Sequence, residues 1–234
     1  MIKKYLKSNY PSLIYLKAKI VGLRLDAKAF CYHVISNSFL LKKQLKAKKK
    51  LHFGSGSDNK PDFINIDINR RADIFLDVRN RLNIPSNSIE YIYSSHFIEH
   101  LEHADLVAHL KECYRILKAG GVLRLGVPDF PKVFNWYCNG DDEPLEIRRK
   151  MLGEKFMLPP DLICAMDVIN KAIYEFGEHK TCLDMEKVRN LLIFCGFSPS
   201  AITASEFDHQ IDVIARKELT FFVEARKIAE NYVV

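Results

Sequence analysis

The sequence of 234 residues lacks the features that mark secreted and membrane-spanning chains. Its six cysteines include no Cys-x-x-Cys pair and form no dense framework, which is typical of thiols kept reduced in a cytosol. No window approaches the roughly 18 apolar residues of a membrane span, and no apolar stretch precedes a small-residue cleavage site at the N-terminus. We therefore expect a cytoplasmic protein that is neither exported nor a bundle of membrane helices.

Acidic residues are nearly absent from the first fifty positions, which hold thirteen lysines and arginines against the single acid Asp26. The remaining positions hold 22 basic and 28 acidic residues, so the net charge of +6 hides two parts of opposite sign. Apolar residues recur at helical spacing between the early lysines. The sequence therefore predicts a basic helical segment over residues 1–50 and a separate domain over 51–234.

Three roles fit this basic segment. Its amphipathic helices could dock on the domain and cover a ligand, which is the role we favour. They could also lie on the anionic inner face of a membrane, which would make the protein peripheral there. Binding to the phosphates of a nucleic acid is the least favoured role. The sequence does not indicate an oligomeric state.

From residue 51 onward short apolar strands alternate with helices, which is the pattern of βαβ units around a parallel sheet. Helices are expected at 104–118, ended by Gly120-Gly121, and at 185–195, ended by Gly196. Strands are expected at 51–53, 63–66, 74–78, 89–93 and 122–127, followed by an antiparallel hairpin of 212–215 and 219–225. The predicted class is α/β with a Rossmann-like sheet of seven strands, in which residues 130–180, rich in aromatics and prolines, form an inserted cap.

Polar residues end four of these strands, at the edge where parallel sheets bind ligands. The glycines of Gly54-Ser55-Gly56 let the backbone turn sharply and approach a ligand. The carboxylate of Asp67, with Ile68 beside it, could accept hydrogen bonds from both hydroxyls of a ribose. The remaining two ends are Asp77-Val78, which suits an adenine, and Ser94-Ser95-His96. Each end alone could be a surface turn, but four in succession indicate one site.

These stretches resemble the class I S-adenosylmethionine-dependent methyltransferases, and more narrowly small methyltransferase-domain proteins with SSHxxEHL and LKxGGxLRxxVPD motifs. The matching residues are Phe53-Gly54-Ser55-Gly56, Asn65-Ile66-Asp67, 94–101 and 117–129. The resemblance covers 51–130, with a weaker echo at 183–197 and 219–227, and leaves 1–50 and 130–180 uncovered. It implies S-adenosylmethionine with its amino acid part over Gly54–Gly56, its ribose on Asp67, its adenine by Asp77 and Val78, and its sulfonium above Ser94-Ser95-His96.

The chain also departs from that family. His52 stands where the wider superfamily usually has an acid, and Asp58 replaces a third glycine. Only ten residues separate Gly56 from Asp67, which leaves little room for the usual first helix and for a lid built from it.

Methyl transfer is an in-line displacement, so the enzyme supplies positioning and, for a hydroxyl acceptor, a base. His96, Asp129 and His179 are the candidate catalytic residues, and a packed or capping side chain is the alternative for each. Tyr93-Ser94-Ser95 stands where many amino-directed methyltransferases carry an Asn/Asp-Pro-Pro-aromatic tetrad. The resemblance further suggests an oxygen of a sugar, a sugar phosphate or a capsule precursor as the acceptor. An RNA-directed methyltransferase and a noncatalytic nucleotide-binding protein are the alternatives.

The stretch from His96 to His100 also matches the H-x-x-E-H zinc pattern, for which Glu175 or Glu178 would be the third ligand. A zinc peptidase of that kind carries the motif on a helix, whereas this one follows a strand end in a sheet-forming series. We therefore prefer the methyltransferase interpretation and expect no metal.

Overall fold

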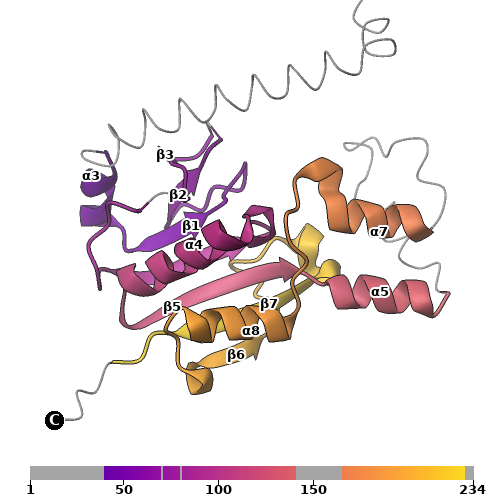
Figure 1. Ribbon diagram of the computed structural model, residues 1–234. Helices are drawn as coiled ribbons and strands as arrows, with labels where there is room; N and C mark the ends of the chain where they lie inside the picture. Colours follow the sequence, from indigo (N-terminus) through magenta and orange to yellow (C-terminus); the bar gives the residue numbers. More distant parts are fainter. Residues whose placement is uncertain (1–39, 70, 80, 141–164, 230–234) are drawn as a thin grey trace, which may run out of the picture.

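The computed structural model describes residues 40–69, 71–79, 81–140 and 165–229. These residues form a sheet of seven strands in the order β3-β2-β1-β4-β5-β7-β6 (Figure 1). The strands are β1 Lys50–Phe53, β2 Ile64–Asp67, β3 Ile74–Phe75, β4 Ile89–Ser95, β5 Leu117–Pro128, β6 Ile202–Ser205 and β7 Thr220–Arg226. The first five are parallel, and β7 runs antiparallel to β5 and β6. The predicted α/β class with a Rossmann-like sheet is confirmed.

The strand order reverses at β1, which pairs with β2 on one side and with β4 on the other. In an open parallel sheet the crevice outside the carboxyl ends at such a reversal is the usual ligand site. The fold therefore places its candidate site beyond Phe53, Asp67 and Ser95, the last residues of β1, β2 and β4.

Helices α4 (His103–Ile116) and α8 (Met185–Phe194) cover one face of the sheet (Figure 1). Helix α4 buries Leu106, Leu110 and Cys113, whose spacing of three to four residues places them on one side. Helix α8 begins at the N-cap Asp184, whose side chain accepts the Lys187 N–H, and Gly196 follows its end with a φ of +113°. The buried side chains of α4 and α8 pack these two predicted helices against the core.

Helix α3 (Leu40–Ala47) is the described end of the basic segment, and its Leu41 and Leu45 are buried in the same core as the sheet. Residues 1–39 lie outside the described residues, so the helices predicted there stay predictions, as do their docking, membrane and nucleic-acid contacts. Among the helices that the structure describes, none is long and apolar enough to cross a bilayer.

Helices α5 (Phe130–Cys138) and α7 (Ala165–Tyr174) lie beyond the carboxyl end of β5 (Figure 1). They pack against each other, and the short helix η2 (Glu175–Gly177) continues α7. Their small core is separate from that of the sheet and consists of Phe130, Val133, Ile169, Ala172 and Leu219. Residues 141–164 of the predicted cap lie outside the described residues. The described part of the cap thus stands beside the ligand-binding edge.

Three predicted elements are wrong in detail. Residues 212–215 are not a strand: Asp212 is buried in a turn, the short helix η4 spans Ile214–Leu219, and β6 is the strand that pairs with β7. The helix predicted to reach 118 ends at Ile116, and Gly120-Gly121 lie in β5, where Gly120 takes a φ of +79° at an irregularity in the pairing with β4. The third strand ends at Phe75.

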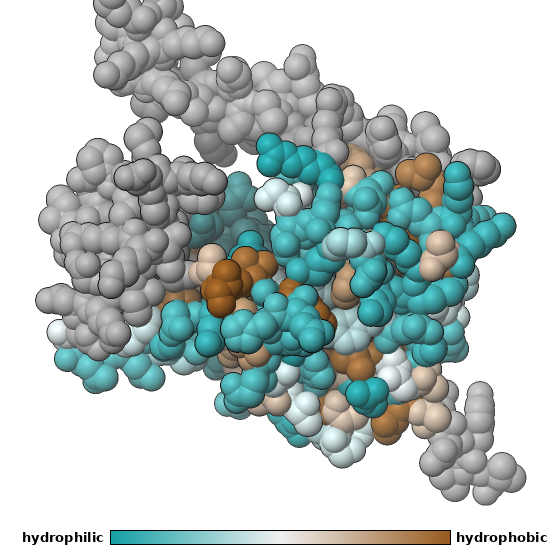
Figure 2. Space-filling model, turned by 180° about the vertical axis from the view of Figure 1, so that it is seen from behind, coloured by the Kyte–Doolittle hydropathy of each residue, from teal (hydrophilic) through white to brown (hydrophobic). Residues whose placement is uncertain are grey.

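The link between β1 and β2 contains turns and no helix, as the short spacing from Gly56 to Asp67 predicts. The crevice at these strand ends is therefore not roofed by a helix from this link. Viewed from behind, the described surface is mostly hydrophilic, with some hydrophobic side chains gathered near its centre (Figure 2).

Candidate functional site

The turn after β1 is built on two glycines in the left-handed region. Gly54 has a φ of +68° and Gly56 a φ of +54°, a conformation that glycine adopts without the penalty a Cβ would bring. The Gly54 N–H donates to the Ile66 carbonyl over 3.0 Å, which holds the turn against β2. A Cβ on Gly54 would lie 2.5 Å from the Phe97 ring, whereas one on Gly56 would meet nothing within 4 Å.

This difference predicts unequal effects for two matched substitutions. Gly56→Ala is expected to lower the free energy of unfolding by about 1 kcal/mol, because only the left-handed backbone is strained. Gly54→Ala is expected to cost a further 1–3 kcal/mol or so, because the Phe97 ring must move. Urea unfolding of both variants measures the difference, and equal stabilities would contradict the close approach of Phe97.

Asp67 ends β2 and organises the glycine turn. Its Oδ2 accepts the Gly56 N–H over 2.8 Å, and its Oδ1 accepts the Asn69 N–H over 2.7 Å. A carboxylate has about four acceptor positions, so both oxygens keep capacity for a further donor. Ile68 is 49% exposed directly beside it, which leaves an apolar side chain uncovered at the predicted nucleoside site.

Asp77 and Val78, predicted as the end of the third strand, come after β3 in the structure, and both are buried. The Asp77 carboxylate is engaged by Arg79, whose Nη2 lies 2.6 Å from Oδ2 and whose Nε lies 2.9 Å from the same oxygen. An adenine amino group would therefore share this carboxylate with a guanidinium. The adenine contact stays a prediction.

The end of β4 presents buried hydroxyls. Ser94 and Ser95 are each at most 3% exposed, and so is Ser55 at the end of β1. The Oγ atoms of Ser55 and Ser94 have no hydrogen-bond partner among the described residues. A buried polar atom without a partner is costly. The two hydroxyls, one in the turn after β1 and one in the neighbouring strand β4, therefore indicate a polar ligand.

His96 comes directly after β4 and has a φ of +51°, which is unusual for a residue with a Cβ. Its Nε2 lies 2.8 Å from the Thr220 Oγ1. That hydroxyl donates its only proton to the Arg216 carbonyl, so the His96 Nε2 must be the donor. The neutral ring therefore carries no proton on Nδ1, so the lone pair of Nδ1 is the one that could accept a proton.

Arg216, on η4, is a site residue that the sequence analysis missed. Its Nη1 donates to the Ser95 carbonyl over 2.9 Å, which holds the guanidinium at the end of β4. Nothing local distinguishes this arginine in the sequence, because 121 residues separate it from Ser95.

Glu99 lies beneath this end of the sheet and is fully buried. Neither of its carboxylate oxygens has a well-formed hydrogen bond among the described residues, and the backbone N–H groups of Phe97 and Glu99 lie near enough only to offset part of the pKa shift caused by burial. The Oε1 atom lies 3.8 Å from His96 Nδ1, 3.9 Å from His100 Nε2 and 4.0 Å from His179 Nε2. Burial raises the pKa of the Glu99 carboxyl to about 8 and lowers the pKa of His100. The structure thus brings two of the predicted catalytic residues, His96 and His179, to one buried acid.

Glu99→Gln is expected to stabilise the protein. The measurement is made in the presence of a chelator, so that no metal ion can bind the carboxylate. The raised pKa makes the folded state take up a proton, so stability falls as pH rises from about 4.5 to about 8. A glutamine side chain is neutral at every pH, so the variant avoids the cost of burying a charged carboxylate. It should be more stable by about 1 kcal/mol or more at pH 8, with little difference at pH 4. Thermal unfolding at both pH values checks this, and a less stable variant at pH 8 in chelator would contradict it.

Asp129, the third predicted catalytic residue, caps a helix. It is the N-cap of α5, and its Oδ1 accepts the Lys132 N–H over 3.0 Å. The hydrogen bond from the Lys132 N–H therefore supports a capping role for Asp129, and its catalytic role stays a prediction.

His52, the departure from the family pattern, is a buried side chain in β1. Its Nδ1 lies 3.3 Å from the Asn65 Oδ1, and its ring packs on Tyr93. Burial and the neighbouring Lys60 lower its pKa to about 4, so the ring is neutral at pH 7. His52 therefore packs inside the sheet, on the strand that lies between β2 and β4.

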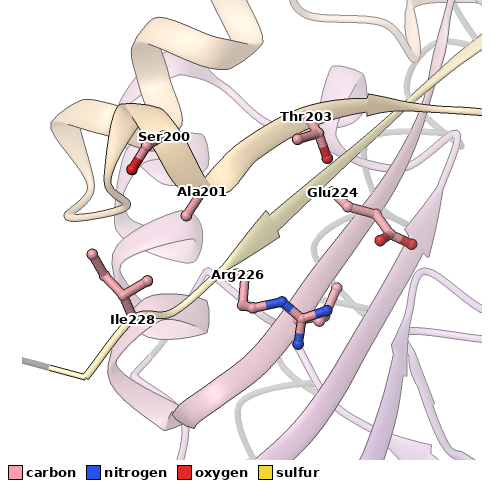
Figure 3. A pocket seen from close by; sticks show the side chains of 7 residues that line it. Ser200, Ala201, Thr203, Glu224, Arg226 and Ile228 are labelled. Carbon is pink, nitrogen blue, oxygen red and sulfur yellow. The ribbon is translucent and has the colours of Figure 1, made fainter.

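A separate pocket of about 320 Å³ lies at the other end of β5 (Figure 3). It is lined by Val122, Thr203, Glu224, Arg226 and Ile228, and by Ser200 and Ala201 of the short helix η3 (Pro199–Ala201). The Arg226 guanidinium donates to the Gly120 carbonyl. None of the predicted site residues lines this pocket.

Residues 45–125 match a family model described as a methyltransferase domain. The match begins in α3 and ends in β5, so it includes the glycine turn, Asp67 and the stretch from His96 to His100. No curated protein matches the sequence.

Several solved structures are similar in fold. A S-adenosylmethionine-dependent methyltransferase from Archaeoglobus fulgidus is 16% identical with a TM-score of 0.47, and the alignment covers 83% of this chain and 94% of that chain. A second from Methanosarcina mazei is 18% identical with a TM-score of 0.47, over 77% and 92%. Phosphoethanolamine N-methyltransferase 2 from Haemonchus contortus, in complex with S-adenosyl-L-methionine, is 12% identical with a TM-score of 0.43, over 83% and 52%. At such identities these structures carry no information on the acceptor.

Proposed function

From the match of residues 45–125 to a methyltransferase domain, we propose that the chain uses S-adenosylmethionine to methylate a hydroxyl oxygen of a sugar, a sugar phosphate or a related surface-polysaccharide precursor. The observation that carries the proposal is the pairing, at the end of β4, of an imidazole whose Nδ1 is unprotonated with the guanidinium of Arg216. A base and a fixed cation suit a hydroxyl acceptor that also carries a negative charge.

The strand ends fit the cofactor. The open space at Gly56 lets a ligand approach the backbone, and Asp67 keeps acceptor capacity for the two ribose hydroxyls. The hydroxyls of Ser55 and Ser94, which no described residue hydrogen-bonds, offer polar contacts to the amino acid part. When bound, the cofactor supplies a methyl group already activated by its sulfonium, so the protein has to position the acceptor oxygen in line with it.

His96 is the proposed base. The Thr220 hydroxyl fixes its ring by accepting the Nε2 proton, which leaves Nδ1 to take the proton of the acceptor hydroxyl as the oxygen attacks. The side chain is 23% exposed, so an acceptor can reach it from solvent. Positioned bases of this kind contribute roughly 10²- to 10⁴-fold to rates.

Arg216 is the proposed anion contact. Its Nη1 is held by the Ser95 carbonyl, and its side chain is only half-buried. A guanidinium has five donors in a fork that matches a phosphate or carboxylate, so the donors that no described residue engages can bind an acceptor.

The test is incubation of the full chain with labelled S-adenosylmethionine and separate panels of sugars, sugar phosphates, amines and RNA. Methyl ethers of a sugar or sugar phosphate are the expected product. Arg216→Ala should raise the KM for a phosphorylated acceptor at least about tenfold, the loss of one charge-assisted contact, while the cofactor Kd stays the same. The neighbouring Lys217→Ala is the matched control. Labelling of RNA or of amines alone would overturn the proposed acceptor class.

A further inference from the structure

The cluster of Glu99, His100 and His179 joins two segments that are distant in the chain. Glu99 and His100 lie on the short helix η1 (Ile98–His100), and His179 lies after η2, some eighty residues later in the chain. The Glu99 carbonyl accepts the Lys180 N–H over 2.8 Å, which fixes the segment carrying His179 against η1. The possible ligand atoms of Glu99, His100 and His179 all lie within 4.8 Å of one another.

The hydrogen bonds on the far side of each ring determine which nitrogen faces Glu99. His100 Nδ1 lies 3.2 Å from the Glu178 carbonyl, and His179 Nδ1 lies 2.6 Å from the Ala172 carbonyl. A carbonyl can only accept, so both Nδ1 atoms carry the proton. In the neutral rings each Nε2 therefore presents a lone pair to the Glu99 carboxylate, 3.9 and 4.0 Å away.

Acceptor atoms that face one another in a buried place are stabilised by a positive charge between them, which is either a proton on the carboxyl or a metal ion. Histidines that bind metal ions usually donate their other ring N–H to a backbone carbonyl or carboxylate, as both rings do here. We propose that Glu99, His100 and His179 bind a divalent transition-metal ion, which lies next to the end of β4. Neither oxygen of the buried Glu99 has a well-formed hydrogen bond among the described residues, and such an ion would satisfy them.

The donor set indicates the class of metal. Two imidazole nitrogens and one carboxylate suit Zn²⁺, Fe²⁺ or Co²⁺ rather than Mg²⁺ or Ca²⁺, which prefer oxygen ligands. Metal–nitrogen bonds of about 2.0–2.1 Å place the donor atoms of two tetrahedral ligands about 3.3 Å apart. Each histidine Nε2 therefore has to move toward the Glu99 carboxylate by less than about 1 Å. His100 is 31% exposed and gives the ion a route from solvent.

Three protein ligands leave coordination positions open for substrate oxygens. This role rests on the proposed function, whereas metal binding itself does not. In that role the acceptor hydroxyl would bind the ion, and the ion would lower the pKa of that hydroxyl. The hydroxyl proton would then pass to His96 Nδ1. The new O–CH₃ bond then forms as the S–CH₃ bond breaks, and the electron pair of the broken bond stays on sulfur.

The test is a titration of the full, tag-free chain, after removal of metals with a chelator, with Co²⁺ and then Zn²⁺. One Co²⁺ per chain should bind, with visible d–d absorption from nitrogen and carboxylate ligands, and Zn²⁺ should displace it. Glu99→Gln and His100→Ala should each weaken binding at least about tenfold. The exposed His103→Ala should change nothing, which controls for surface histidines.

Absence of stoichiometric Co²⁺ binding, or equal affinity in Glu99→Gln, His100→Ala and the unmodified chain, would overturn the site. His100 is partly exposed, so its variant is expected to fold, and circular dichroism checks this. Asp67→Ala is expected to lose the cofactor but to keep Co²⁺. The metal site and the proposed function can therefore fail separately.

Discussion

Asp67→Ala is expected to weaken binding of S-adenosylmethionine at least about 100-fold, which corresponds to about 2.7 kcal/mol. The carboxylate is expected to accept both ribose hydroxyls, and hydrogen bonds to a charged group contribute about 1.5–3 kcal/mol each. The variant also loses the bond from the Gly56 N–H to Oδ2, so the glycine turn is no longer held in place. Isothermal titration of the full chain with the cofactor measures the change.

The exposed Asp62, in the link between β1 and β2, provides the matched control. Asp62→Ala removes the same charge from the link that precedes β2 but removes no predicted contact, and should leave the Kd within about a factor of two, a few tenths of a kcal/mol. If the two variants bind the cofactor equally well, the ribose contact at Asp67 is wrong.

Arg124→Met is expected to lower the free energy of unfolding by about 3–5 kcal/mol, the usual cost of removing one partner from a buried ion pair. Arg124 is 2% exposed in β5, and its guanidinium binds the Asp212 carboxylate, whose side chain is fully buried. It also donates to the Ser205 Oγ, to the Glu206 carbonyl and to the Glu224 carboxylate. Without it, Asp212 is left buried, and among the described residues only the Asp208 N–H donates to its side chain.

Lys118→Met is the control for this prediction, because the pair of Lys118 with Glu90 is about half exposed on both sides. Exposed pairs contribute about 0–1 kcal/mol, so this variant should unfold at nearly the urea concentration of the unmodified chain. Similar losses in both variants would contradict the idea that Arg124 holds the 205–212 segment on the sheet.

The strand ends could be predicted because their pattern is local. Gly54, Gly56 and Asp67 follow short apolar runs directly, and in a parallel sheet such positions converge on one edge whatever the rest of the chain does. The same holds for Ser94 and His96 after β4. The class of fold follows from the alternation of strands and helices, and the sheet confirms it.

What could not be predicted depends on contacts between distant residues. Residues 212–215 have the apolar pattern of a strand, but Arg124 holds Asp212 in a buried turn from 88 positions away. The H-x-x-E-H stretch suggested Glu175 or Glu178 as a third ligand, yet the structure brings the His179 side chain to Glu99 and uses the Glu178 backbone carbonyl on His100. Neither arrangement has a signal in the sequence around it.

A crystal structure of the full chain with S-adenosylhomocysteine tests the central claim most directly. The account predicts the nucleoside in the crevice at the carboxyl ends of β1, β2 and β4, with both ribose hydroxyls on the Asp67 carboxylate and the amino acid part over Gly54–Gly56. A nucleoside bound elsewhere on the chain, or a crevice filled by side chains at saturating ligand, would contradict it.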